Sequence, residues 1–138
     1  MNILEIPFAK TLGMELNSDG ALEMPFSERI HNHLQTIHAS AQFALAETAS
    51  GATLLQRFPE LEGKLIPVLR DAQVKFRKPA QQNITAYPSL NEEAVEKFRQ
   101  QFSTKGRALI TVNVEVKDVD GTVTCSATYT WFMQAIEP

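Results

Sequence analysis

Every histidine of the chain lies in one stretch, HNHLQTIHASAQFALAE, at residues 31–47, and this stretch also carries a single acid, Glu47. No other formally charged side chain occurs between Arg29 and Arg57. A carboxylate in an apolar segment is costly unless it is paired or neutralised. The residues leave two interpretations open. Glu47 points to solvent or pairs with an arginine, or it is a general base or nucleophile with a raised pKa in a dry pocket.

The histidines invite a metal site, because His31 and His33 would share one side of an extended segment and His38 or Glu47 could complete the set. The signal is weak, since no acid follows the second histidine at the expected spacing. We therefore predict no metal and interpret His31 and His33 as loop residues. His38 differs, because it directly precedes a predicted helix, whose free N–H groups and positive dipole end can stabilise an oxyanion.

Other catalytic patterns are absent from the sequence. There is no G-x-S-x-G nucleophile elbow and no glycine-rich phosphate loop. Cys125 lies in the middle of a predicted strand, where a structural cysteine is the favoured interpretation.

The 138 residues predict a single domain, 1–138. The net charge of -3 argues against nucleic acid as a partner, because phosphate binding needs a basic surface. The single cysteine excludes an intrachain disulfide and favours a cytoplasmic location. We find no signal peptide, and no apolar run long enough to span a membrane.

Hydrophobic periodicity and turn residues predict an α+β domain in which a sheet wraps around one central helix. The helix is ASAQFALAETASGATLLQR, residues 39–57, which is apolar on nearly every face and ends at Phe58-Pro59. A possible capping box, Ser89–Glu92, opens a second helix. The other predicted elements are a short helix at 3–12, a hairpin at 13–26, a loop at 27–37, strands at 66–79 and 82–90, a helix at 89–102 and a hairpin at 107–134.

The strand at 66–79 alternates, with one mostly polar face. Val68, Arg70, Ala72, Val74 and Phe76 are predicted on one face, and the residues between them on the other.

The residues Asn32, His38 and Glu47 follow a spacing, N-x-x-x-x-x-H and then an acid nine residues later on a helix, that resembles the hotdog-fold acyl-CoA thioesterases, especially the phenylacetate-pathway type. The segments TLGMEL, ALAETASG, VKFRKPA, KGRALITVNVEVKD and DGTVTCSATYTWF also look like hotdog elements. The resemblance covers nearly the whole chain.

The resemblance implies a hotdog fold, a long central helix wrapped by an antiparallel β-sheet, and a homodimer, or a tetramer built from dimers, whose sheets join edge to edge. Two sites would lie at the dimer interface. Glu47 would activate water or attack the thioester directly, and the Ala39 N–H would hold the oxyanion. Asn32 would position the water or the thioester, and His38 would help to orient the carbonyl.

The chain departs from the family pattern at three places. Gln35 replaces the usual glycine three residues after the asparagine, His38-Ala39-Ser40 replaces the usual H-G-G, and the acid is Glu rather than the commoner Asp. These departures motivate an alternative, a hotdog module that binds an acyl chain or acyl-CoA without hydrolysing it.

Coenzyme A is implied as part of the substrate, and no further cofactor is required. Lys75, Arg77 and Lys78 are candidates for contact with its phosphates, and Lys105 and Arg107 form a second basic pair. Both groups could instead be solvated strand ends. A tunnel lined by Phe43, Leu54 or Phe76 would accept aryl or aliphatic acyl groups.

Overall fold

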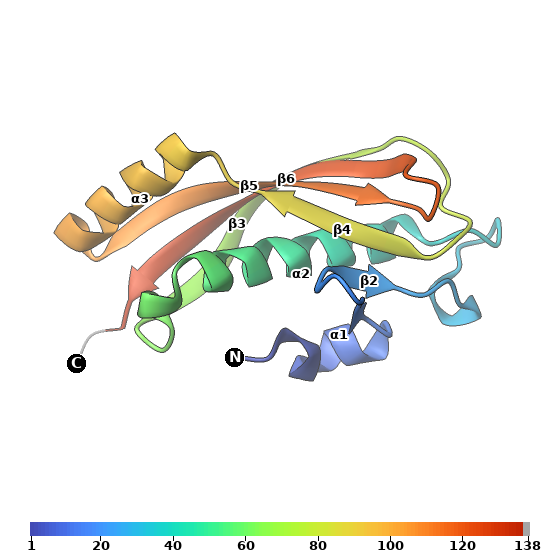
Figure 1. Ribbon diagram of the computed structural model, residues 1–138, viewed down its shortest axis with the longest axis horizontal. Coiled ribbons are helices and arrows are strands. Elements are labelled where there is room, and N and C mark those ends of the chain that lie inside the picture. Colours follow the sequence, from blue (N-terminus) through green and yellow to red (C-terminus); the bar gives the residue numbers. More distant parts are fainter. Residues whose placement is uncertain (137–138) are drawn as a thin grey trace.

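A long helix, α2 (Ala39–Arg57), runs along one face of an antiparallel six-stranded sheet in the computed structural model, which describes residues 1–136 (Figure 1). The strand order across the sheet is β1-β2-β4-β5-β6-β3. The strands are β1 (Glu15–Leu16), β2 (Leu22–Met24), β3 (Leu65–Phe76), β4 (Ile84–Ser89), β5 (Arg107–Lys117) and β6 (Val123–Ala135). The remaining elements are η1 (Ile3–Glu5), α1 (Pro7–Thr11), η2 (Glu28–Ile30), η3 (Pro59–Leu61) and α3 (Glu92–Lys105).

Helix α2 has the bounds that the sequence predicted, 39–57, and no residue from Ala41 to Leu55 is exposed. His38 is its N-cap residue, and Phe58 ends it just before Pro59. Alanine and leucine on its buried face favour the helix and pack on the sheet. Its central turns therefore have fixed positions relative to the inner face of the sheet.

Strand β3 contains a β-bulge at Arg70, because Leu69 pairs with Trp131 while Asp71 pairs with the adjacent Thr130. The extra residue reverses the alternation that the sequence predicted. Leu69, Ala72 and Val74 pack against the core, whereas Arg70 lies on the other face over the Phe132 ring, 4.4 Å from its centroid. The prediction that Arg70, Ala72 and Val74 share one face was therefore wrong.

The outer edge of β3 is uncovered in the single chain. This strand of 12 residues lies at one end of the strand order, and within residues 1–136 its one neighbour in the sheet is β6. The strand at the opposite edge, β1, has only 2 residues. A long open edge with free N–H and C=O groups is a template for pairing with another strand.

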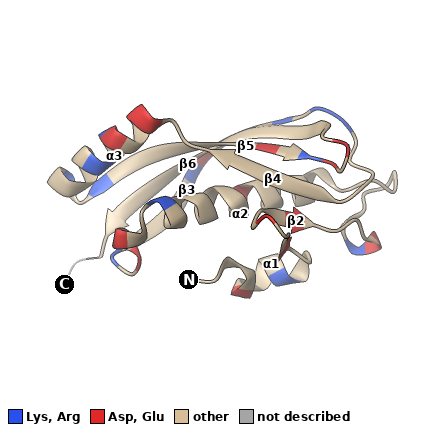
Figure 2. Ribbon diagram, in the orientation of Figure 1, with Lys and Arg blue, Asp and Glu red and all other residues tan. Residues whose placement is uncertain are grey.

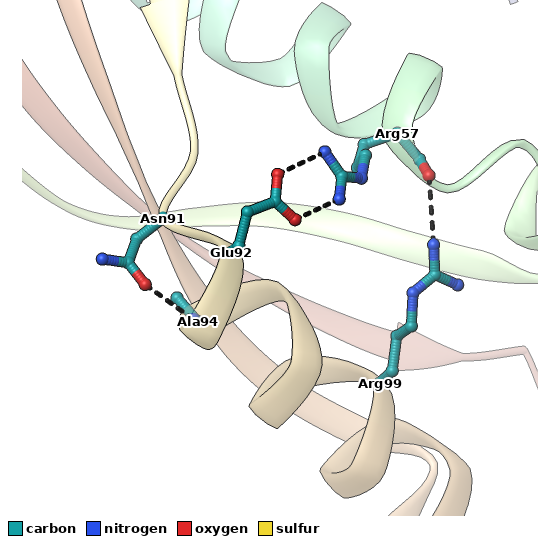
Figure 3. Close-up of polar contacts among 5 residues, drawn as sticks. All are labelled: Arg57, Asn91, Glu92, Ala94 and Arg99. Atoms are coloured by element: carbon teal, nitrogen blue, oxygen red, sulfur yellow. Dashed lines mark hydrogen bonds and ion pairs between the residues drawn. The ribbon is translucent and has the colours of Figure 1, made fainter.

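Helix α3 begins differently from the prediction (Figure 3). Asn91 is the N-cap residue, and its Oδ1 accepts from the Ala94 N–H at 3.0 Å. Ser89 is the last residue of β4, so the predicted Ser89–Glu92 capping box was wrong. The Glu92 carboxylate is free to pair with the Arg57 guanidinium at the end of α2.

Strands β5 and β6 form an antiparallel hairpin, as their alternating sequence predicted, and this hairpin lies between β4 and β3 in the sheet. Gly121 has a φ of +82° in the connecting turn, a backbone conformation that glycine adopts without strain. Within residues 1–136, no helix is long and apolar enough to cross a membrane.

Candidate functional site

Glu47 lies half-buried in the middle of α2, at the edge of a cavity of about 330 Å³. Apart from Glu47 and Thr48, the cavity wall is apolar, with contributions from α2, β6, β3 and the N-terminal segment. Burial raises the pKa of the Glu47 carboxyl above its usual value of 4.5. No ion pair within residues 1–136 involves Glu47, so the interpretation that an arginine pairs with it finds no partner there.

Two aromatic residues of β6 hold the helical turn that carries Glu47. The buried Tyr129 donates from its hydroxyl to the carbonyl oxygen of Phe43, one turn before Glu47, at 2.9 Å. The Trp131 Nε1–H donates to Ser50 Oγ at 2.9 Å, and the Ser50 hydroxyl donates to the carbonyl oxygen of Glu47 at 2.6 Å. The backbone on both sides of Glu47 is thereby tied to the sheet.

These supporting residues were not predicted from the sequence. Tyr129 and Trp131 are two residues apart on β6 and both are buried, as expected for side chains on the inward face of a strand. Burial, and after it the charges of Cys125 and Glu47, raises the pKa of the Tyr129 hydroxyl, which therefore remains a donor. The available signal was the presence of two aromatic side chains with polar groups at alternate positions of one strand, because such groups need a buried partner.

The N-terminus of α2 presents an open hydrogen-bond donor. His38 Nδ1 accepts from the Ser40 N–H at 2.9 Å and so caps the helix. Within residues 1–136 the Ala39 N–H meets no acceptor, and Ala39 is exposed. An exposed N–H at the positive end of a 19-residue helix can receive a carbonyl oxygen that gains negative charge.

Asn32 organises the loop that leads to α2. Its Oδ1 accepts from the N–H groups of Leu34 and Thr36, at 2.8 and 3.1 Å, and its Nδ2 donates to the Thr36 hydroxyl at 2.8 Å. Gln35, in the same loop, has a φ of +57°, the left-handed conformation that favours glycine. The backbone at this position therefore has a conformation that glycine adopts freely, whereas the glutamine is strained there.

A single chain does not bring Glu47 and the Ala39 N–H together. The two residues are eight positions apart on one helix, which at about 1.5 Å per residue is about 12 Å. A base that activates water and a donor that holds the oxyanion both act within about 3 Å of the reacting carbonyl group. Within one chain, therefore, Glu47 and the Ala39 N–H cannot both reach the same carbonyl group.

Comparison with known proteins identifies the family and the fold. Residues 4–133 match the family described as a domain of unknown function, DUF4442. The chain belongs to the DUF4442 family. A comparison with curated proteins gives no match.

The solved structures similar to this DUF4442 chain include a probable thioesterase of unknown function from Pseudomonas aeruginosa, with a TM-score of 0.83 and 23% identity over 97% of this chain and 91% of that one. A thioesterase from Haemophilus influenzae has a TM-score of 0.75 at 18% identity, over 99% and 88% of the chains. A Bacillus halodurans protein solved with CoA has a TM-score of 0.71 at 21% identity, over 91% and 74%. The chain has the hotdog fold, and the predicted α+β class is confirmed.

The two basic groups of this DUF4442 chain lie at opposite ends of α2. Arg77 follows β3, where its N–H donates to the Thr124 carbonyl at 2.8 Å, and the Thr124 hydroxyl donates to Gln42 Oε1 near the start of α2 at 2.7 Å. Its neighbours Lys75 and Lys78 are also exposed. Figure 2 shows basic residues on the segment that follows β3. Lys105 and Arg107 instead flank Gly106, which accepts from Ala135 near the other end of the helix.

The histidines before α2 and the single cysteine of the DUF4442 chain show no arrangement that would bind a metal or act as a nucleophile in residues 1–136. The His31 ring packs on Phe26, with 4.4 Å between centroids. No group of three or more His, Cys, Asp or Glu side chains in residues 1–136 is arranged to hold a metal ion. Burial raises the pKa of the Cys125 thiol to about 11, which disfavours the reactive thiolate.

The residues that line the cavity beside Glu47 differ from those that the sequence predicted for an acyl tunnel. Phe43 packs edge-on against Tyr129, Leu54 is buried in the core and Phe76 is 48% exposed. None of these three residues lines the 330 Å³ cavity, whose walls include Phe8, Gly51, Leu55, Trp131 and Met133.

Proposed function

We propose that this protein hydrolyses acyl-CoA thioesters, with Glu47 as the general base. The observation that carries the proposal is a half-buried carboxylate that has no ion-pair partner in residues 1–136 and lies at the edge of an apolar cavity. Burying an unpaired carboxylate lowers the stability of the fold, and groups of this kind are frequent at functional sites. Its raised pKa brings the carboxylate nearer to the working pH, where a general base is most effective.

In the proposed reaction, the Glu47 carboxylate takes a proton from water while the water oxygen forms a bond to the thioester carbonyl carbon. The carbonyl oxygen becomes an oxyanion and accepts a hydrogen bond from the Ala39 N–H. When the intermediate collapses, the C–S bond breaks and the leaving thiolate takes the proton from Glu47. The products are the free acid and the thiol of coenzyme A. The donor helps the transition state more than the substrate, because the charge develops only during the reaction.

The Ala39 N–H in this scheme belongs to a second copy of the chain. The separation of about 12 Å along α2 rules out a shared carbonyl within one chain. The open edge of β3 supports a homodimer in which the β3 strands of two copies pair and the two sheets join. Each Glu47 would then face the start of the partner's helix.

Coenzyme A is the proposed carrier of the acyl group, and no further cofactor is proposed. The similar Bacillus halodurans structure that contains CoA supports this choice. Lys75, Arg77 and Lys78 are proposed to contact its phosphates, because their segment is linked through Thr124 to the end of α2 that carries Ala39. The proposed role of His38 is to hold the start of the helix, through the bond from Ser40 to its Nδ1.

The second candidate function is a hotdog module that holds an acyl chain or acyl-CoA without turnover. Two observations favour it. Gln35 occupies a strained left-handed position where the family has glycine, and the Asn32 Oδ1 is fully engaged within its own loop. Binding of acyl-CoA with no release of thiol would select this module.

The decisive experiment is to measure thiol release from short, medium and aromatic acyl-CoAs by the wild type, Glu47→Ala and Glu47→Gln. Loss of the base is expected to lower kcat by at least about 100-fold. Glu96→Gln is the matched control, because Glu96 is an exposed acid on α3. Equal turnover by the Glu47 variants would remove Glu47 as the base, and no turnover by the wild type on any substrate would favour the binding module.

A mixing experiment tests the shared site. Ala39→Pro deletes the donor N–H at the first helical position, which tolerates proline. When Ala39→Pro and Glu47→Gln chains are unfolded together and refolded, half of the dimers are mixed, and one of the two sites in each mixed dimer has both groups intact. Activity is expected to return to about a quarter of the wild-type value. If the mixture stays as inactive as its components, the shared site is wrong.

A further inference from the structure

Two aromatic side chains line the cavity beside Glu47, the exposed Phe8 of α1 and the buried Trp131 of β6. We infer that this cavity receives the acyl group and that Trp131 sets the size of the acyl group that the protein accepts. The identity of the ligand rests on the proposed function, whereas the capacity of the cavity does not.

The indole of Trp131 is fixed from two sides. Its Nε1–H donates to Ser50 Oγ at 2.9 Å, and its six-membered ring lies against Gly51 of the next helical position. A Cβ added at Gly51 would lie 3.3 Å from Cζ2 and 3.5 Å from Cη2 of the indole. The glycine therefore makes room for the ring, and Ser50 locks its orientation, so that Trp131 is a rigid wall.

The lining restricts the chemistry of the occupant. Its only polar residues are Glu47 at the edge and the adjacent Thr48, whereas Leu55, Met133 and the N-terminal Phe8 are apolar. A charged or hydroxylated chain end would lose its hydration here without finding a partner. The wall therefore favours an unsubstituted aliphatic or aromatic acyl group.

The dimensions set a capacity. The α2 residues of the wall run from Glu47 to Leu55, a span of about 12 Å along the helix. The volume is about 330 Å³. A water molecule occupies about 30 Å³ of liquid, and a methylene is of similar size, so a cavity of about 330 Å³ holds about eleven heavy atoms. A medium-chain or phenyl-substituted acyl group has this size.

Trp131 is the only tryptophan of the chain, so its fluorescence reports on the cavity directly. The probe is a series of straight-chain primary alcohols from butanol to tetradecanol, which are neutral and contain no thioester. Affinity is expected to rise about fourfold per methylene until the cavity is full at about eleven heavy atoms, and then to level off. If the fluorescence does not respond to any alcohol, or if affinity rises without a limit up to tetradecanol, the inference is wrong.

Two variants test the role of the indole. Trp131→Phe removes three heavy atoms from the wall and is expected to move the limit upward by two to three carbons, as measured by calorimetry because the fluorophore is lost. Gly51→Ala places a methyl group against the ring and is expected to move the limit downward by about one carbon. Gln56→Ala is the control, because Gln56 is an exposed residue of the same helix that does not line this cavity. An unchanged limit in Trp131→Phe that still unfolds cooperatively would overturn the role of Trp131.

The outcomes separate this inference from the proposed function. If the affinity for alcohols levels off at the expected chain length but no acyl-CoA releases thiol, the cavity has the inferred capacity and the proposed hydrolysis is wrong. If thiol is released from acyl-CoAs while Trp131→Phe keeps the wild-type chain-length profile, the enzyme stands and the role of Trp131 is wrong.

Discussion

The two ends of α2 are built in opposite ways. At the C-terminal end, the Arg57 guanidinium pairs with Glu92, and the Arg57 carbonyl accepts from Arg99 at 3.4 Å (Figure 3). Phe58 packs on Phe98 with 4.8 Å between ring centroids. At the N-terminal end, Ala39 is an exposed residue and its N–H meets no acceptor in residues 1–136. A satisfied helix end adds stability, whereas an open one keeps its binding capacity for a ligand.

The largest expected effect is on stability at the satisfied end. Phe58→Ala removes a buried ring that contacts Phe98 and lies under the Arg99 guanidinium. The free energy of unfolding is expected to fall by about 3 to 4 kcal/mol, because the aromatic contacts are lost and a cavity remains. Urea denaturation measures the change. The kcat of the folded fraction is expected to stay at the wild-type value. A large drop in that kcat would contradict the view that this end of α2 serves stability alone.

The corresponding change at the open end is expected to act on catalysis. Ala39→Pro should lower kcat by about 100- to 1000-fold, the usual effect of losing one oxyanion donor. The free energy of unfolding should change by less than about 0.5 kcal/mol, because a proline is accepted at the first helical position. Ala39→Gly keeps the N–H and is the matched control, with activity near that of the wild type. A Pro variant as active as the Gly variant would show that this donor has no catalytic role.

Between the two ends, Glu47 should show its burial as a pH dependence of stability. Its pKa is raised in the folded protein, which therefore binds the proton more tightly than the unfolded chain does. The stability of the wild type should fall as the pH rises from about 4.5 through the raised pKa, and the destabilisation should be complete above that value. Glu47→Gln cannot ionise, so it should be more stable than the wild type at neutral pH and similar below about pH 4. Urea denaturation across this pH range would contradict the burial argument if the difference were constant.

The smallest effect concerns the loop before the open end. Gln35→Gly should relieve the left-handed strain and raise the free energy of unfolding by about 0.5 to 1 kcal/mol. This corresponds to an increase in Tm of about 2 to 4 °C for a chain of this size. Leu34→Gly, at the adjacent position without a positive φ, should instead lower the Tm. Calorimetric scans that show the same shift for both variants would exclude strain at Gln35.

Much of the fold followed from local patterns in the sequence. The bounds of α2 came from its apolar composition and from Phe58-Pro59, and the β5–β6 hairpin came from strict alternation around Asp120-Gly121. The bulge at Arg70 could not be predicted, because its position depends on how β3 pairs with β6. The local sequence of β3 contains no residue that indicates it. Asn91 rather than Ser89 caps α3 because β4 continues through Ser89.

The site was predictable in its parts and not in its arrangement. Glu47 is conspicuous as the only charge between Arg29 and Arg57, and His38 lies where the helix signal begins. Its burial without an ion pair is a property of the packed fold. The hydrogen bond from Trp131 to Ser50, which in turn binds the Glu47 carbonyl, joins residues 81 positions apart in the chain, and no local sequence pattern predicts it.

Because the outer edge of β3 lies open in the single chain, protein concentration enters the chemistry of the proposed enzyme. A monomer would carry a base and an oxyanion donor that cannot act on the same carbonyl, so turnover would require association. Specific activity would then fall on dilution below the dissociation constant of the dimer, by mass action. The cellular abundance of the chain would thus set both how much enzyme is present and what fraction of it is assembled.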